Sequence, residues 1–82
     1  MSTEETMRNY ILENYLFTDD QSALSNSDSF MEKGIIDSTG ILEVIHFLED
    51  EMGITVEDED MIPENLDSID NIVAFVNSKK AA

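Results

Sequence analysis

The chain has 82 residues, a length that allows one small domain and rules out a two-domain enzyme. Hydrophobic residues make up 41% of it and charged residues 28%, which is typical of a folded protein rather than a disordered or collagen-like one. Nineteen acidic residues against four basic ones give a net charge of −15. Nucleic-acid binding needs clustered lysine or arginine, so we expect basic protein surfaces, and not nucleic acid, as partners.

The chain contains no cysteine, which excludes a disulfide, a thiolate nucleophile and a cysteine-based zinc site. Its first residues are acidic and lack the basic and apolar regions of a signal peptide. No apolar run approaches the ~18 residues of a membrane span. We therefore expect a monomeric cytoplasmic protein that does not insert into membranes, and any thiol chemistry must come from an added group.

A first helix is predicted over about residues 3–16, because Ser2 and Glu5 have capping-box spacing ahead of apolar residues at helical intervals. Residues 17–34 are rich in serine, aspartate and asparagine, which favour turns and predict a long loop. Three apolar side chains are expected to pin this loop to the core: Leu24, Phe30 and Met31.

The strongest helical pattern covers residues 38–52. Ser38 is predicted as its N-cap, because a serine hydroxyl at that position can accept a bond from a first-turn N–H. Gly53 provides a C-terminal stop. The stripe expected to face the bundle consists of Ile41, Val44, Ile45, Leu48 and Met52.

The remainder of the chain predicts at most one short helical turn near residues 58–65 and a last helix over 67–78. Asp67 is the expected N-cap of that helix. No segment alternates with period two for long enough to form a strand. We therefore predict an all-α fold, a small antiparallel bundle of three main helices plus one short helix, forming a single domain over residues 1–82.

The sequence argues against an enzyme. Ser38 and the single histidine, His46, are eight residues apart on one predicted helix, or ~12 Å along its axis, so they cannot form a hydrolase triad. The acidic run around Asp58 fails the calcium-loop pattern, because Pro63 and Ile69 stand where glycine and glutamate are needed. We predict no catalytic residue and no metal ligand.

Methionine is used repeatedly among the apolar positions, which predicts either ordinary core packing or a plastic groove for a flexible apolar ligand. Both hold if the core is loosely packed and opens between helices. The residues concerned are Met7, Met31, Met52 and Met61.

Serine follows aspartate three times, at residues 28–29, 37–38 and 67–68, and only the middle pair immediately precedes the strongest helix. The stretch around it, FMEKGIIDSTGILEVI over residues 30–45, resembles the signature of the acyl and peptidyl carrier proteins. The order and spacing of the family continue through about residue 77, so the resemblance covers nearly the whole chain from Phe30.

The resemblance implies a four-helix carrier in which Ser38, next to the signature Asp37, holds 4′-phosphopantetheine through a phosphodiester. The arm comes from coenzyme A by a phosphopantetheinyl transferase, and it carries acyl intermediates as thioesters in fatty acid, lipid or polyketide-type biosynthesis. The implied partners are acyl-transferring or condensing enzymes with basic docking surfaces. The implied recognition residues, besides Asp37, are Thr39, Leu42, Glu43, His46, Glu49 and Asp50.

The chain departs from the fatty-acid type at Thr39 and Gly40, where leucine and then an acidic or polar residue are usual. An Asp-Ser-x-Gly version looks more like D-alanyl, aminoacyl or nonribosomal peptidyl carriers, which leaves the cargo open between acyl and aminoacyl groups. From another class, an acidic adaptor that is never modified is also compatible with the sequence. Modification of Ser38 separates the two classes, because an adaptor does not need it.

Overall fold

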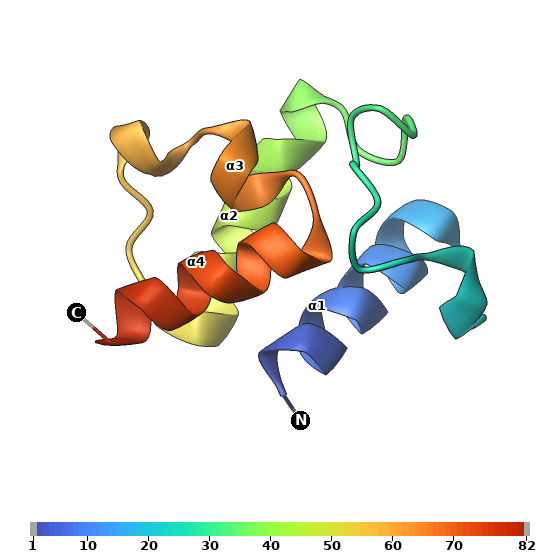
Figure 1. Cartoon of the computed structure of the whole chain (residues 1–82), viewed down its shortest axis with the longest axis horizontal. Helices are drawn as coiled ribbons and strands as arrows, with labels where there is room; N and C mark the ends of the chain where they lie inside the picture. Colours follow the sequence, from blue (N-terminus) through green and yellow to red (C-terminus); the bar gives the residue numbers. More distant parts are fainter. Residues whose placement is uncertain (1, 82) are drawn as a thin grey trace.

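The computed structural model describes residues 2–81, and within them the chain forms helices and no strand (Figure 1). The all-α prediction is therefore confirmed for this range. The elements in chain order are α1 (Thr3–Ile11), the π-helical turn η1 (Leu12–Leu16), the 3-10 turn η2 (Gln21–Ala23), α2 (Ser38–Met52), the 3-10 turn η3 (Asp58–Asp60), α3 (Pro63–Leu66) and α4 (Ile69–Ala81).

The first predicted helix is correct in extent, but its last turn is π-helical rather than α-helical. Ser2 is the N-cap, and its hydroxyl oxygen accepts the Glu5 N–H at 3.1 Å. Phe17 ends the helix in the left-handed conformation, with φ of 53°, and donates its N–H to the Leu12 carbonyl. This is the geometry in which helices usually place glycine.

Phe17→Gly should stabilise the protein by about 1 kcal/mol, because glycine adopts a left-handed backbone without the steric cost of a side chain. The Phe17 ring is 83% exposed, so its removal forfeits little packing. Urea unfolding would measure the change in the free energy of unfolding. Phe17→Ala, which keeps the backbone strain, should not stabilise, and an equal gain in both variants would contradict the conformational explanation.

The C-terminal half differs from the prediction in its boundaries. Two short elements, η3 and α3, replace the single expected turn, and α4 begins at Ile69 instead of residue 67. The Ser68 hydroxyl, not Asp67, takes the capping position, where it accepts the Asn71 N–H at 3.1 Å. Asp67 is unavailable as a cap because its carboxylate accepts the Met31 N–H at 3.1 Å and the Ser29 hydroxyl.

The long loop between η1 and α2 is tied down by two polar side chains. Arg8 of α1 donates to the carbonyls of Gln21 and Leu24, at 2.6 and 2.7 Å, and to Asn26 Oδ1 at 2.6 Å. Asp67 holds the later part of the loop from the other side of the molecule. These bonds compensate for the absence of regular structure over most of the loop.

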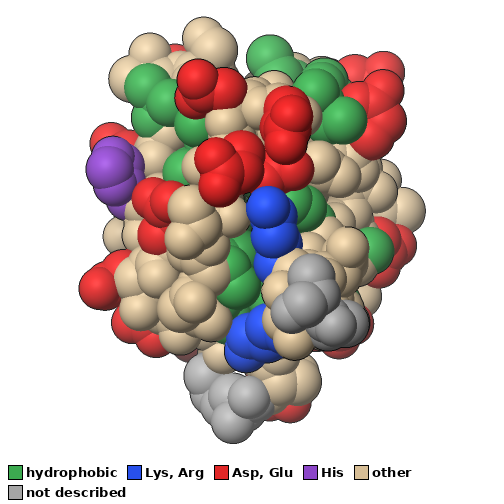
Figure 2. All heavy atoms as spheres, turned by 90° about the vertical axis from the view of Figure 1, so that its left-hand side faces the viewer, with side chains coloured by type: hydrophobic (Ala, Val, Ile, Leu, Met, Phe, Trp, Pro, Cys, Tyr) green, Lys and Arg blue, Asp and Glu red, His purple; other side chains and the backbone are tan. Residues whose placement is uncertain are grey.

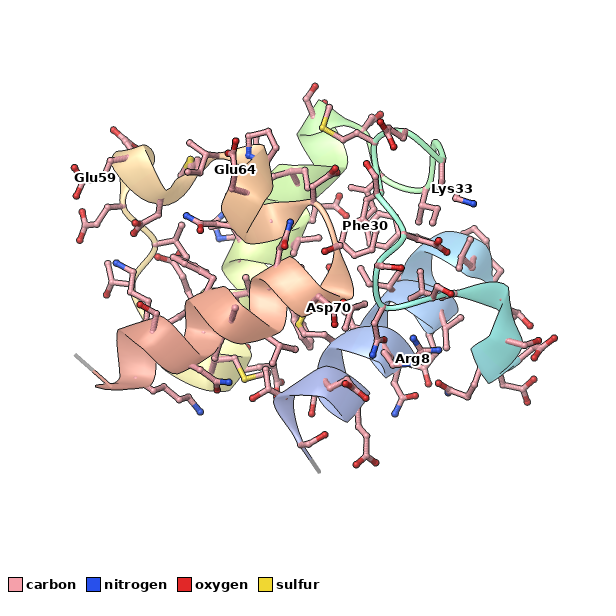
Figure 3. The ribbon with its side chains drawn as sticks, viewed as in Figure 1. Arg8, Phe30, Lys33, Glu59, Glu64 and Asp70 are labelled. Atoms are coloured by element: carbon pink, nitrogen blue, oxygen red, sulfur yellow. The ribbon has the colours of Figure 1, made fainter. Side chains whose placement is uncertain are left out.

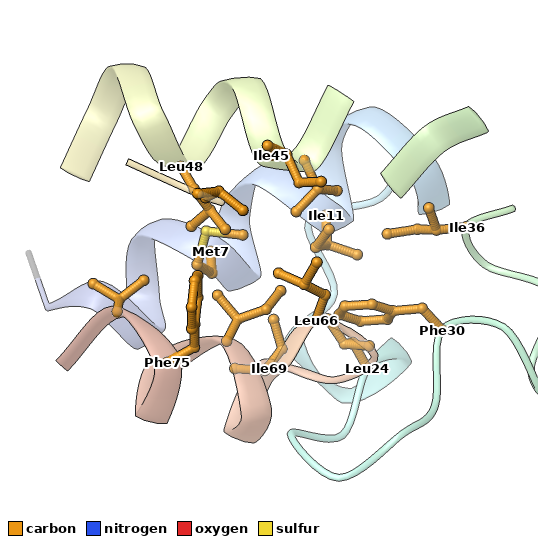
Figure 4. Close-up of a cluster of buried hydrophobic side chains, with 14 of the residues drawn as sticks. Met7, Ile11, Leu24, Phe30, Ile36, Ile45, Leu48, Leu66, Ile69 and Phe75 are labelled. Carbon is orange, nitrogen blue, oxygen red and sulfur yellow. The ribbon is translucent and has the colours of Figure 1, made fainter. Parts of the chain in front are cut away.

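The core lies between α1, α2 and α4, and the loop closes one end of it (Figure 4). Leu24 and Phe30 are buried as predicted, whereas Met31 is 51% exposed, because the bond of its N–H to Asp67 holds it at the surface. Of the predicted stripe on α2, three residues are buried and the other two pack against the core from its edge. The buried three are Val44, Ile45 and Leu48, and the edge residues are Ile41 and Met52.

Candidate functional site

Ser38 is the first residue of α2 and is exposed. Its predicted role as N-cap is wrong: Asp37 caps the helix, with Oδ1 accepting the Gly40 N–H at 2.8 Å. A carboxylate at this position also interacts favourably with the positive end of the helix dipole, which a neutral hydroxyl does not match. Within residues 2–81 the Ser38 hydroxyl makes no hydrogen bond, so it is available to an external group.

Gly40 brings the first turn of α2 into close contact with its neighbours. A Cβ atom at this position would lie 2.7 Å from Ile36 Cγ2 and 3.4 Å from Tyr15 Cε1. The Tyr15 hydroxyl lies 3.3 Å from the Gly40 carbonyl and donates to Glu43 Oε2 at 2.9 Å. The absence of a side chain at residue 40 therefore lets Ile36 and Tyr15 support the helix start on which Ser38 stands.

An apolar groove of about 140 Å³ opens beside Ser38, between the start of α2 and the η3–α3 segment. Met31, Met61 and Ile62 are exposed at 51%, 40% and 43%, respectively. Met7 is buried and Met52 partly buried, so these four methionines divide between the core and the groove. The lining consists of Met31, Ser38, Ile41, Met61, Ile62, Pro63, Leu66 and Asp67.

The position of α3 in this groove depends on polar ties to α4. Asn71 Nδ2 donates to the Pro63 carbonyl at 3.3 Å, and Lys79 Nζ lies 2.6 Å from Asp60 Oδ2 in the preceding turn. The hydrogen bond to Lys79 is the main cause that lowers the pKa of Asp60 below its ordinary value. One wall of the groove is thus attached to α4 and the opposite wall belongs to α2.

The predicted recognition residues share one face of α2, spread over about 20–140° around the axis from Ser38. Their surroundings differ, however. Glu43 already accepts the Tyr15 hydroxyl, and Glu49 Oε2 accepts the Val56 N–H at 3.1 Å, so both carboxylates also hold the fold together. Burial, together with hydrogen bonds to Tyr10 and Glu43, raises the pKa of Tyr15 above its ordinary value. Glu43 is exposed and Glu49 half-buried, and the other members of the face, Thr39, Leu42, His46 and Asp50, are all exposed.

The other two Asp-Ser pairs are structural. Ser68 is buried and caps α4, and the Ser29 hydroxyl is bonded to Asp67. Of these three serines, only Ser38 has a hydroxyl without a hydrogen bond in the described part of the chain. This agrees with the sequence, in which only the Asp-Ser pair at 37–38 directly precedes the strongest helical pattern. The supporting roles of Tyr15 and Asp67 carry no local sequence signal, because both act on residues more than twenty positions away.

Acidic side chains are spread over the face drawn in Figure 2, and basic ones form a short strip between them. Among residues 2–81, no three His, Asp or Glu side chains are grouped so that they could hold a metal ion. None of the helices in that range has the length and apolar character needed to cross a bilayer. The site is therefore an exposed hydroxyl, an apolar groove and an acidic helix face.

Comparison with protein-family models finds no match for this chain, and a search of the curated proteins finds none either.

Proposed function

We propose that the chain is a noncatalytic carrier that bears 4′-phosphopantetheine on Ser38 and transports acyl groups between enzymes as thioesters. The observation that carries the proposal is the Ser38 hydroxyl, which is exposed and unbonded at the start of α2 while Asp37 performs the capping. The bound arm supplies the thiol for the thioester, which this cysteine-free chain cannot provide itself.

The surroundings of Ser38 fit a phosphodiester. In its attachment, Ser38 Oγ forms the new P–O bond, its hydroxyl proton passes to a base of the transferase, and adenosine 3′,5′-bisphosphate leaves coenzyme A. The attached phosphate is favoured by the positive end of the α2 dipole. The hydrogen bond that caps the helix is made by the Asp37 carboxylate, which accepts the Gly40 N–H. Attachment of the arm to the Ser38 oxygen therefore breaks no hydrogen bond that holds the helix start.

The groove supports a small apolar cargo. Its volume of about 140 Å³ lies well below the ~300–1,000 Å³ of pockets that enclose drug-sized ligands. At ~30 Å³ per water-sized group, it has room for about five such groups. A short acyl chain fits this space, and so does an aminoacyl group, which keeps an aminoacyl or D-alanyl carrier as the second candidate. A long chain would have to extend beyond the groove or widen it.

Attachment of the arm is the decisive experiment. The purified chain should gain the mass of one arm when it is incubated with coenzyme A, magnesium and a broad-specificity phosphopantetheinyl transferase. The intact mass of the protein from its own source should then show the arm together with its cargo, which distinguishes acyl from aminoacyl groups. A chain that gains no arm and carries none at its source would favour the unmodified adaptor instead.

A further inference from the structure

A second groove, of about 390 Å³, lies on the opposite part of α2, between its C-terminal half and the α1–η1 helix. Its aromatic residues are Tyr10 and Phe47, whose rings stack with centroids 3.9 Å apart and planes at 18°. Both side chains are only half-buried, so part of their ring surface faces solvent. The carrier function does not use this groove.

Two carboxylates stand at its opposite ends. Tyr15 contacts Gly40 while Tyr10 contacts Phe47, so α1 and α2 run antiparallel here. Glu13 follows Tyr10 towards one end, and Glu51 follows Phe47 towards the other. At ~1.5 Å per residue, the Cα atoms of Glu13 and Glu51 lie about 5 Å to either side of the ring pair along the helix axes, or about 10 Å apart.

The negative charge of the groove has no basic counterpart among its lining residues. Arg8, five residues before Glu13, is directed into the loop instead, where it is bonded to Gln21, Leu24 and Asn26 (Figure 3). Glu13 and Glu51 are both exposed, and no ion pair to either of them is found within residues 2–81. An aromatic surface between two uncompensated carboxylates is complementary to a cation.

We propose that this groove is a docking site for an arginine side chain of a basic partner protein. A planar guanidinium stacks on aromatic rings and donates several N–H bonds at once, whereas an ammonium acts as a compact, strongly hydrated charge. Phe47 is nine residues beyond Ser38, or ~13 Å along α2, so a partner held here leaves Ser38 accessible. The proposal does not depend on modification of Ser38.

Titration of the ¹⁵N-labelled chain with the peptide acetyl-Gly-Arg-Gly-Arg-Gly-amide tests this site. Amide shift changes should concentrate on the residues around Tyr10 and Phe47, and the lysine version of the peptide should bind several-fold more weakly. Glu13→Gln combined with Glu51→Gln should raise the Kd of the arginine peptide about five- to tenfold. Asp58→Asn with Glu59→Gln removes the same charge from η3 and should change the Kd less than about twofold.

Phe47→Leu keeps an apolar side chain but removes the ring, and it should reduce the preference for arginine over lysine while helicity by circular dichroism is retained. Equal weakening by the two charge-matched pairs, or shift changes spread over all acidic residues, would show that net charge alone attracts the peptide and would overturn the proposal. Equal binding of the arginine and lysine peptides by the parent chain would also overturn it, because the aromatic rings would then play no part. None of these outcomes bears on whether Ser38 accepts the arm.

Discussion

Ser38→Ala is expected to abolish attachment of the phosphopantetheine arm completely while leaving stability within about 0.5 kcal/mol of the parent. The two effects separate because the Ser38 hydroxyl makes no hydrogen bond within residues 2–81, whereas Asp37 carries the capping bond to the Gly40 N–H. Alanine at the first helical position keeps the helix start intact. Intact-mass measurement after incubation with coenzyme A and the transferase, together with urea unfolding, gives both quantities.

The other two serines that follow aspartate should show the reverse pattern. Ser68→Ala removes the cap of α4 and should lower the free energy of unfolding by about 1 kcal/mol. Ser29→Ala removes the bond to Asp67 and should cost about 1–2 kcal/mol. Both variants should still accept one arm. Arm attachment to Ser38→Ala would refute the assignment of the site, and a large loss of stability in that variant would refute the division of roles between Asp37 and Ser38.

The main helices follow from the sequence because their signals are local and strong. Residues 38–52 were predicted with the bounds that α2 has, since a continuous apolar stripe ends at Gly53, which adopts the left-handed conformation with φ of 66°. On α4, spacing alone predicts a stripe of Ile69, Ile72, Val73 and Val76. Three of these residues are buried, and Val73 packs against the core from its edge. Periodicity therefore predicts which faces are buried when an element is long enough.

The cap assignments of α2 and α4 failed because two good capping residues are adjacent at the start of each of these two helices. At Asp37-Ser38 the aspartate has the extended backbone of an N-cap, and at Asp67-Ser68 the serine takes the cap because the aspartate is bonded to the loop. The choice of Ser68 over Asp67 as the cap of α4 depends on the hydrogen bond between Met31 and Asp67. These two residues are too far apart in the sequence for a local pattern to predict that contact. The exposure of Met31 at the groove follows from the same contact.

The structure gives a physical reason for the glycine at residue 40 that the sequence alone does not reveal. At the level of the sequence, Gly40 marks a departure from the fatty-acid carriers and leaves the cargo open. In the structure it is the position where Ile36 and Tyr15 pack against the backbone of α2. A packing requirement therefore accounts for the glycine without reference to the cargo.

Gly40→Ala is expected to destabilise the protein by about 1–3 kcal/mol, although alanine is favoured over glycine in a helix by about 1 kcal/mol. The added Cβ would lie 2.7 Å from Ile36 Cγ2, and Ile36 is 2% exposed, so its branched side chain has little room to move. The same methyl lies 3.4 Å from Asp37 Oδ1, the capping oxygen. Urea unfolding measures the loss, and arm attachment should be slower because the helix start at Ser38 is disturbed.

Thr39→Ala is the matched control, because residue 39 is exposed on the same turn and alanine there should be neutral or stabilising by a few tenths of a kcal/mol. Ile36→Leu tests the cause directly, since leucine has no γ2 methyl and its volume is the same. The double variant Gly40→Ala with Ile36→Leu should recover about half of the loss, a coupling of 0.5 kcal/mol or more between the two sites. If the effects of the two substitutions on the free energy of unfolding are strictly additive, the Ile36 methyl is not the obstacle. If the Gly40→Ala variant is as stable as the parent, the helix start tolerates a side chain at residue 40.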